Sequence, residues 1–157
     1  MATINSDISK RIALDSELQK QGTIGGIIAC TGFIGFFIVM NLLGLGGEVW
    51  LRAVNGIILA LSILMILRSV QQQNHGNFDF LLGLRLGLRI TLISVIPFSL
   101  FMFLSLTLNN DLLVYIQENS WFGAYLTPIS AAGMLCIEGI ASGFIMSYIY
   151  MMRFKSS

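Results

Sequence analysis

Apolar residues are gathered in four long runs, and polar residues lie between these runs and at the two ends of the chain. A helix needs about 20 mostly apolar residues to cross the hydrocarbon core of a bilayer. The second run is the shortest, because Arg52 and Arg68 bound its uncharged part, and it spans only if both arginines reach toward opposite interfaces. The pattern predicts an all-α polytopic membrane protein with four transmembrane helices, over residues 23–45, 51–70, 80–108 and 125–152.

The polar segments around this four-helix domain, residues 23–152, are short. Residues 1–22 are expected to form an N-terminal tail that is either a short surface helix or solvated, because its apolar positions have only loose helical spacing. Residues 153–157 form a C-terminal tail. Asn110 and Asp111, between the third and fourth runs, are suited to cap a short helix whose apolar residues would lie on the bilayer surface.

Composition supports the membrane interpretation. Hydrophobic residues make up 55% of the chain and charged residues 11%, whereas a soluble domain averages about 25% charged. So few charges cannot cover a water-facing surface, and we expect the apolar side chains to face a lipid bilayer. The formal net charge of +1 gives no strong attraction to nucleic acid.

Lysine and arginine are unevenly distributed over the polar segments. Arg52 is the one basic residue in the first connection, and the third connection has none. All other basic residues lie in the two tails, at Arg68, or at the start of the third run. Short loops rich in lysine and arginine stay cytoplasmic. We therefore predict a cell (inner) membrane protein with both termini in the cytoplasm.

Glu138 is the one acidic residue deep within an expected span. A charge in the middle of a bilayer costs several kcal/mol, so such a residue is protonated, paired or in contact with water. Glu138 is therefore a candidate for an intramembrane proton or cation site. The alternative is a structural role, in which a protonated carboxyl group hydrogen-bonds a neighbouring helix.

Arg89 is the candidate partner of Glu138. Arg85 and Arg89 are four residues apart and share one helix face. If the third span is centred near Ile93, a pair between Glu138 and Arg89 is within reach. If it is centred near Ser99, the gap is about 15 Å and contact fails. The competing interpretation is that these arginines reach anionic headgroups at the inner surface.

Small residues recur at every third or fourth position of the first and fourth runs. Such stripes let helix backbones approach closely and pack by dispersion. They predict tight packing of these two helices, either within the bundle, where the two helices are candidates to meet, or against a partner protein or a second copy. The helix-packing candidates are Gly25, Ala29 and Gly32 in the first run and Ala132, Gly139 and Gly143 in the fourth.

No catalytic constellation is visible in the sequence. One histidine and two cysteines, both cysteines inside apolar runs, do not make a typical metal site. Phosphate-binding loops and nucleophile elbows have no counterpart here. We expect no cofactor and no enzymatic activity.

The second half of the chain carries two recognisable stretches. One reads Phe-x-Phe-x-x-Gly-Leu-x-x-Gly from Phe78 to Gly87, and the other is the Ile-Glu-Gly-Ile-Ala-Ser-Gly segment at 137–143, before the basic tail. In these features the chain resembles an uncharacterised family of small four-helix bacterial membrane proteins, domain of unknown function 4199. The resemblance covers about half of the chain. It implies the fold and a membrane location but no known activity.

Two families with a membrane glutamate fit less well. The four-span proteolipid of rotary ATPases has its glutamate in the last helix, but its inner helices are saturated with glycine and its termini face away from the cytoplasm. Small multidrug exporters carry theirs in the first span, where this chain has no acid. The leading functional hypothesis is an accessory or assembly subunit that packs through its small-residue faces. The alternative is a small oligomeric proton- or cation-coupled transporter that uses Glu138.

Overall fold

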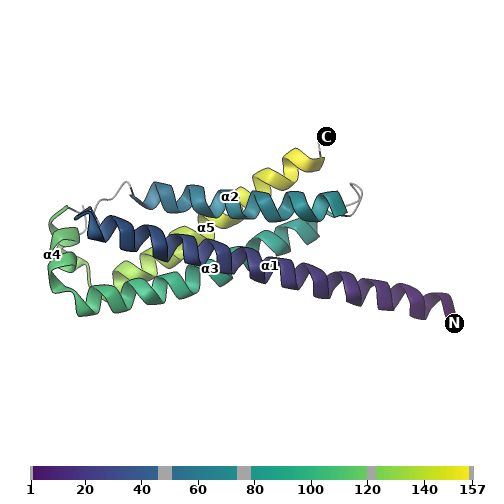
Figure 1. Cartoon of the computed structure of the whole chain (residues 1–157), viewed down its shortest axis with the longest axis horizontal. Coiled ribbons are helices and arrows are strands. Elements are labelled where there is room, and N and C mark those ends of the chain that lie inside the picture. The colour runs from purple at the N-terminus through teal and green to yellow at the C-terminus, as the bar shows by residue number, and fades with distance from the viewer. Residues whose placement is uncertain (1, 46–50, 74–78, 120–122, 156–157) are drawn as a thin grey trace.

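The computed structural model describes residues 2–45, 51–73, 79–119 and 123–155, with the backbone alone for 2–14, 119, 124 and 155. Over these residues the fold is all-helical (Figure 1). Four segments are long and apolar enough to cross a membrane: Asp15–Leu42, Leu51–Gln73, Phe80–Leu108 and Pro128–Phe154. The predicted helical fold with four apolar helices is therefore confirmed. The helices are α1 (Ala2–Leu42), α2 (Leu51–Gln73), α3 (Phe80–Leu108), α4 (Asn110–Asn119) and α5 (Pro128–Lys155), with a 3₁₀ turn η1 (Gly123–Tyr125).

Helix α1 is longer than the apolar run that predicts it. It runs without a break through residue 22, where the tail was expected to end. It ends in a Schellman motif, in which Leu45 N–H donates to Met40 O at 2.9 Å and Gly44 N–H to Asn41 O at 3.1 Å. Gly44 has a φ of 74°, a left-handed conformation that glycine adopts without steric cost. The first apolar helix therefore stops at Leu42.

Helix α3 is the centre of the bundle. It makes its most extensive contacts with α1 and α5, and α2 contacts all three. The largest side chains with almost no exposed surface include Ile63 and Leu67 of α2 and Ile90 of α3. Figure 1 shows α4 and the C-terminal end of α1 at one end, which we term the α4 end, and the two chain termini toward the other, which we term the terminal end.

Helix α4 covers the α4 end of the bundle. The side chain of Asn109 accepts a hydrogen bond from Leu112 N–H at 3.4 Å, so Asn109, rather than the expected Asn110 or Asp111, caps the helix. Leu112 packs with Leu106 and Leu126 and is buried. The expectation that this residue lies on the bilayer surface is therefore wrong.

A capping motif fixes the start of α5. Thr127 Oγ1 accepts a hydrogen bond from Ser130 N–H at 3.2 Å, and Ser130 Oγ accepts one from Thr127 N–H at 2.8 Å. Pro128 occupies the first helical position, where its missing N–H costs nothing. The fourth span was expected to begin at residue 125, but Tyr125 belongs to η1.

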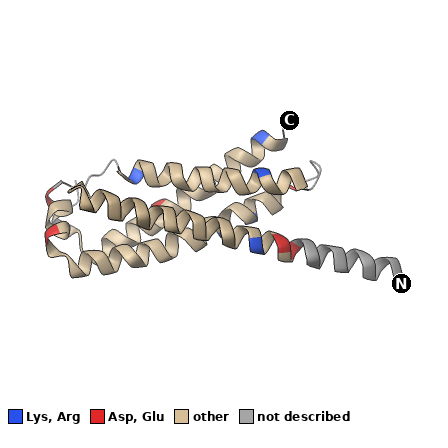
Figure 2. Cartoon of the chain, viewed as in Figure 1, with Lys and Arg blue, Asp and Glu red and all other residues tan. Residues whose placement is uncertain are grey.

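Figure 2 shows the charged residues mainly toward the two ends of the bundle. Large apolar side chains such as Ile28, Ile137 and Phe144 are exposed along the helices between them. This distribution is typical of a protein whose solvent is lipid at its middle and water at its ends. Of the lysine and arginine side chains that the structure describes, Arg52 is at the α4 end, whereas Lys20, Arg68, Arg85, Arg89 and Arg153 lie in the half nearer the terminal end.

Candidate functional site

The small residues of α1 face α2 and α3. A Cβ atom placed on Gly25 would lie 2.7 Å from Ile66 Cγ1 and 3.3 Å from Ile90 Cγ1, and one on Gly32 would lie 3.1 Å from Ile58 Cγ2. Ala29, between them, has no exposed surface. These contacts leave no room for larger side chains, so this stripe holds α1 against the bundle.

The small residues of α5 face α3. A Cβ atom on Gly139 would lie 2.7 Å from Val95 Cγ1, and one on Gly143 would collide with the side chain of Thr91. Ala132 is buried, and its carbonyl accepts a hydrogen bond from Ser99 Oγ at 2.6 Å. The α5 stripe is therefore packed on α3 and does not form a free interface.

Helix α3 contributes a small residue of its own to this packing. Gly87 faces the side chain of Ser147 on α5, and both residues are buried. Sequence reasoning missed Gly87, although Gly83 and Gly87 form a Gly-x-x-x-Gly pair on one helix face. The idea that α1 and α5 pack on each other is wrong for the described residues, because each packs on α3 instead.

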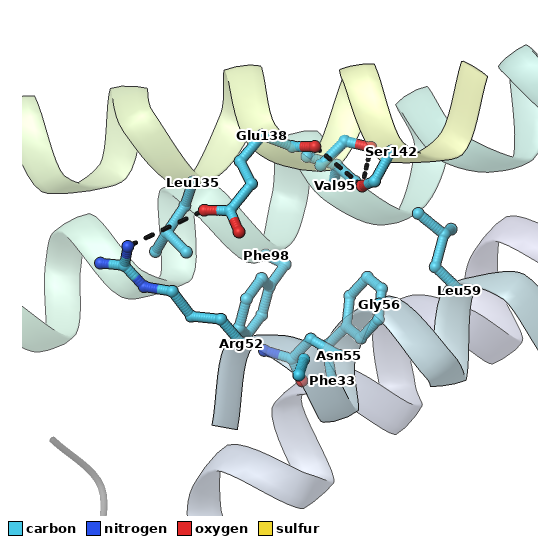
Figure 3. A pocket seen from close by; sticks show the side chains of 12 residues that line it. Phe33, Arg52, Asn55, Gly56, Leu59, Val95, Phe98, Leu135, Glu138 and Ser142 are labelled. Atoms are coloured by element: carbon cyan, nitrogen blue, oxygen red, sulfur yellow. Dashed lines mark hydrogen bonds and ion pairs between the residues drawn. The ribbon is translucent and has the colours of Figure 1, made fainter. Parts of the chain in front are cut away.

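Glu138 pairs with Arg52 and not with Arg89. Glu138 Oε2 lies 3.8 Å from Arg52 Nη1, and Figure 3 shows the two side chains directed toward each other from α5 and α2. The next residue of α5, Gly139, packs on Val95, which lies six positions beyond Arg89, or about 9 Å along the helix. Arg89 is thus at the wrong depth, and its guanidinium contacts Thr23 Oγ1 at 3.5 Å.

Arg52 is the functional candidate that sequence reasoning missed. It is the second residue of α2, which begins at the α4 end. Glu138 is on α5, which begins at the same end. The sequence does contain a signal for this pair, because both helices begin at the same end of the bundle. Arg52 is the one basic residue in the first connection and is therefore the natural counter-charge for an acid in that half of the bundle.

A pocket of about 290 Å³ surrounds the ion pair. All four long helices contribute to its wall, so the pocket exists only in the assembled bundle. The rings of Phe33 on α1 and Phe98 on α3 have centroids 5.2 Å apart and form part of the apolar lining. The lining includes Phe33, Asn55, Leu59, Val95, Phe98 and Leu135 (Figure 3).

Three polar side chains besides Arg52 line this pocket. The Oδ1 atom of Asn55 is buried and has no hydrogen-bond partner among the described residues. Ser142 Oγ donates within its own helix, with the carbonyls of Glu138 and Gly139 at 2.8 and 3.1 Å. Glu138 keeps 55% of its side-chain surface exposed. The pocket therefore offers one exposed oxygen acceptor group, the carboxylate of Glu138, beside aromatic rings, while Asn55 Oδ1 is buried in the wall.

Metal chemistry has no visible basis in this region, since no group of three histidine, cysteine, aspartate or glutamate side chains gathers within the described parts of the chain. What the pocket groups can do is bind a molecule by charge, hydrogen bonds and apolar contact.

Comparison with protein-family models, curated proteins and solved structures finds no match to this chain. The resemblance to domain of unknown function 4199 therefore stays a prediction. Phe78, the first residue of the Phe-x-Phe stretch, lies outside the described residues, whereas Phe80 begins α3 and packs edge-on against Tyr148 of α5, with ring centroids 5.7 Å apart.

Proposed function

We propose that the protein is a non-enzymatic integral membrane protein that binds a cationic amphiphile in the pocket between its four long helices. In this proposal both termini are cytoplasmic, so the pocket opens toward the outer face of the cell membrane. The observation that carries the proposal is the carboxylate of Glu138, half exposed in an aromatic-lined pocket. The resemblance to domain of unknown function 4199 belongs to the same proposal and supplies no activity.

The position of Arg52 along its helix indicates the depth of the ion pair. Helix α2 has 23 residues, a length of about 34 Å, which is close to the roughly 30 Å of a hydrocarbon core. Arg52 is its second residue and therefore lies at the membrane boundary. The guanidinium of Arg52 therefore supplies a counter-charge to Glu138 at a depth where an isolated charge is costly.

The groups in the pocket favour a cation over an anion. An ammonium group has three donors and no acceptor, and the pocket supplies an acceptor in the exposed carboxylate of Glu138. Phe33 and Phe98, both almost fully buried, add two aromatic rings to the pocket lining. Leu59, Val95 and Leu135 complete an apolar wall suited to an alkyl body.

Arg52 competes with the ligand for Glu138. Its nitrogen lies 3.8 Å from the carboxylate oxygen, longer than the 2.7–2.9 Å or so of a charge-assisted hydrogen bond. A ligand ammonium that reaches hydrogen-bond distance from Glu138 makes the stronger contact and displaces Arg52. The arginine is free to turn toward water, because it begins α2 at the membrane boundary.

The accessory-subunit hypothesis loses its original basis, because the small-residue faces on which it rested pack inside the bundle. Cation-coupled transport by an oligomer remains as the second candidate. The exposed 55% of the Glu138 side chain favours it, since a transported cation must be able to enter and leave. Cation binding at Glu138 is the first step of such a cycle, so both candidates share one test.

Equilibrium dialysis of the purified protein in neutral-detergent micelles, against radiolabelled n-decylamine, tests the proposal, with protein-free micelles to subtract partitioning. We expect saturable binding of decylammonium and none of decanoate. Replacing Glu138 with Gln removes a charge-assisted hydrogen bond worth about 1.5–3 kcal/mol, and should weaken binding by roughly 10- to 100-fold.

The matched variant is Arg52→Gln. It removes the competing cation, so we expect decylammonium to bind more tightly than to the wild type. The two substitutions therefore act in opposite directions, a result that general loss of structure cannot produce. Weaker binding in both variants, or preferential binding of decanoate, would refute a cation site.

A further inference from the structure

A second groove lies on the other half of the bundle, between α1 and α3. Its volume is about 500 Å³, and the pocket that contains Glu138 shares none of its lining residues. Arg85 and Arg89 line one wall of it from α3, and Asp15 and Gln19 stand on the facing helix α1. The other lining residues are Leu18, Leu82, Leu86, Leu88, Leu92 and Ile93.

The side chain of Arg89 packs over a glycine of the facing helix. A Cβ atom on Gly22 of α1 would lie 3.0 Å from Arg89 Cδ and 3.0 Å from Leu86 Cδ1, so the glycine makes room for the arginine stem. The guanidinium then reaches Thr23 Oγ1 at 3.5 Å. The Arg89 head group therefore lies against α1 at the level of Thr23.

The described lining of the groove has two arginines against one aspartate and therefore a net positive charge. Asp15 lines the same groove, yet neither Arg85 nor Arg89 has a carboxylate within ion-pair distance in the part of the chain that the structure describes. Both arginine residues are exposed. Two like charges one helical turn apart repel each other unless an anion lies between them.

The depth of these arginines matches a headgroup layer. The roughly 20 residues that a span requires, counted back from Leu108 at the α4 end of α3, reach Arg89. The same count from Leu42, at the α4 end of α1, reaches Thr23. Arg89 and Thr23 are in contact, so the counts along the two helices place the membrane boundary at the same level. Arg85 lies one turn beyond it.

Below the arginines the groove becomes apolar. Leu92 and Ile93 follow Arg89 toward the middle of α3, and both are partly exposed. An acyl chain entering the bilayer from this level would pass along them. The groove is thus charged toward the terminal end and apolar toward the middle of α3. A phospholipid has the same order of a charged headgroup and an apolar chain, whereas a free ion has no apolar part.

We propose that this groove is a binding site for an anionic phospholipid, whose phosphate lies between Arg85 and Arg89 and whose acyl chain lies along Leu92 and Ile93. Basic grooves between helices at the cytoplasmic surface bind such headgroups by charge, reinforced by hydrogen bonds from the guanidinium groups. The site is separate from the proposed cation pocket and its test does not depend on that proposal.

Native mass spectrometry of the detergent-purified protein tests the site, with titration of dioleoyl phosphatidylglycerol and, separately, dioleoyl phosphatidylcholine. The two lipids have identical chains and differ in net charge. We expect at least a tenfold preference for phosphatidylglycerol. Arg85→Gln should reduce that affinity severalfold, and Arg85→Gln with Arg89→Gln should lower it to the phosphatidylcholine value.

Arg68→Gln is the matched control. Arg68 is exposed in the same half of the bundle but does not line the groove. It should leave the affinity for phosphatidylglycerol unchanged. An equal loss in Arg68→Gln would mean diffuse attraction and overturn the site, as would equal binding of the two lipids.

Inorganic phosphate separates a lipid from a free anion. Up to millimolar phosphate should leave phosphatidylglycerol bound, because phosphate has no acyl chain to lie along Leu92 and Ile93. If phosphate displaces the lipid completely at that concentration, the groove is a free-anion site and the lipid proposal is wrong. Arg85 makes no hydrogen bond or ion pair within the described structure, so Arg85→Gln alone gives a readable result even if the double variant folds poorly.

Discussion

The two charged regions of the bundle use arginine in opposite ways. At the α4 end, Arg52 on α2 faces Glu138 on α5 at 3.8 Å, inside a pocket lined by all four long helices. In the other half, Arg85 and Arg89 both project from α3 into a groove shared with α1, and no described carboxylate lies within ion-pair distance. The first region is internally neutralised and the second is not.

This difference shows that the location of the counter-charge decides what an arginine at a membrane boundary does. An arginine paired across helices ties two helices together and must be displaced before a ligand cation can bind the acid. Two arginines on one helix that form no ion pair present net positive charge and attract an anion from outside. Variants of the helix packing that both regions share, or of either charged region, test this difference.

The largest expected effect comes from the packing that supports both regions. Gly143→Leu forces a side chain into Thr91 of α3, and overpacking of this kind costs about 3 kcal/mol or more when backbone must shift. We expect the thermal unfolding midpoint in detergent to fall steeply, with loss of both proposed binding activities.

Gly133→Leu on the same helix is the control, because a Cβ atom there meets nothing within 4 Å. Its unfolding midpoint should match that of the wild type. Equal loss of stability in the two variants would mean that glycine itself, and not the α3–α5 contact, is needed in α5.

A middle-sized effect is expected from the ion pair. Arg52→Gln leaves Glu138 without its partner, and because both side chains are more than a third exposed we expect a loss of at most about 1 kcal/mol. Adding Glu138→Gln removes the orphaned charge and should restore most of the stability. Chemical unfolding of the wild type, both single variants and the double variant gives the coupling energy. A coupling energy near zero would show that the two charges do not interact.

The smallest expected effect concerns one interhelical hydrogen bond. Ser99 Oγ donates to Ala132 O of α5 at 2.6 Å, and such bonds contribute about 0.6 kcal/mol in membrane proteins. Ser99→Ala should lower the unfolding free energy by that amount. Ser62, equally buried, bonds to Ile58 O of its own helix, so Ser62→Ala should have less effect. The reverse order would contradict the assignment.

The helices themselves were predictable because the length of an apolar run determines whether it can span a bilayer. The third run matches the bounds of α3, Phe80–Leu108. The end of α1 was harder, because Leu43 and Leu45 continue the apolar run while the Schellman motif around Gly44 already stops the helix. Hydropathy does not detect a change in backbone conformation.

The candidate site was only partly predictable. The isolated acid Glu138 and the small-residue stripes stand out in sequence, because both are unusual in a membrane helix. Their partners do not, since partner choice depends on the relative depth of helices. Arg89 was the wrong partner for Glu138 by about 9 Å along α3, and Arg52 was overlooked because it belongs to a helix end. Asn55, an ordinary polar residue by sequence, is distinguished only by its buried oxygen.

The pairing of Arg52 with Glu138 also has a consequence for the synthesis of the chain. Arg52 precedes Glu138 by the 86 positions from 52 to 138, which a ribosome adds in about 4–17 s at 5–20 residues per second. In the proposed membrane topology, α2 with Arg52 therefore inserts before α5, and Glu138 meets its counter-charge as soon as α5 inserts.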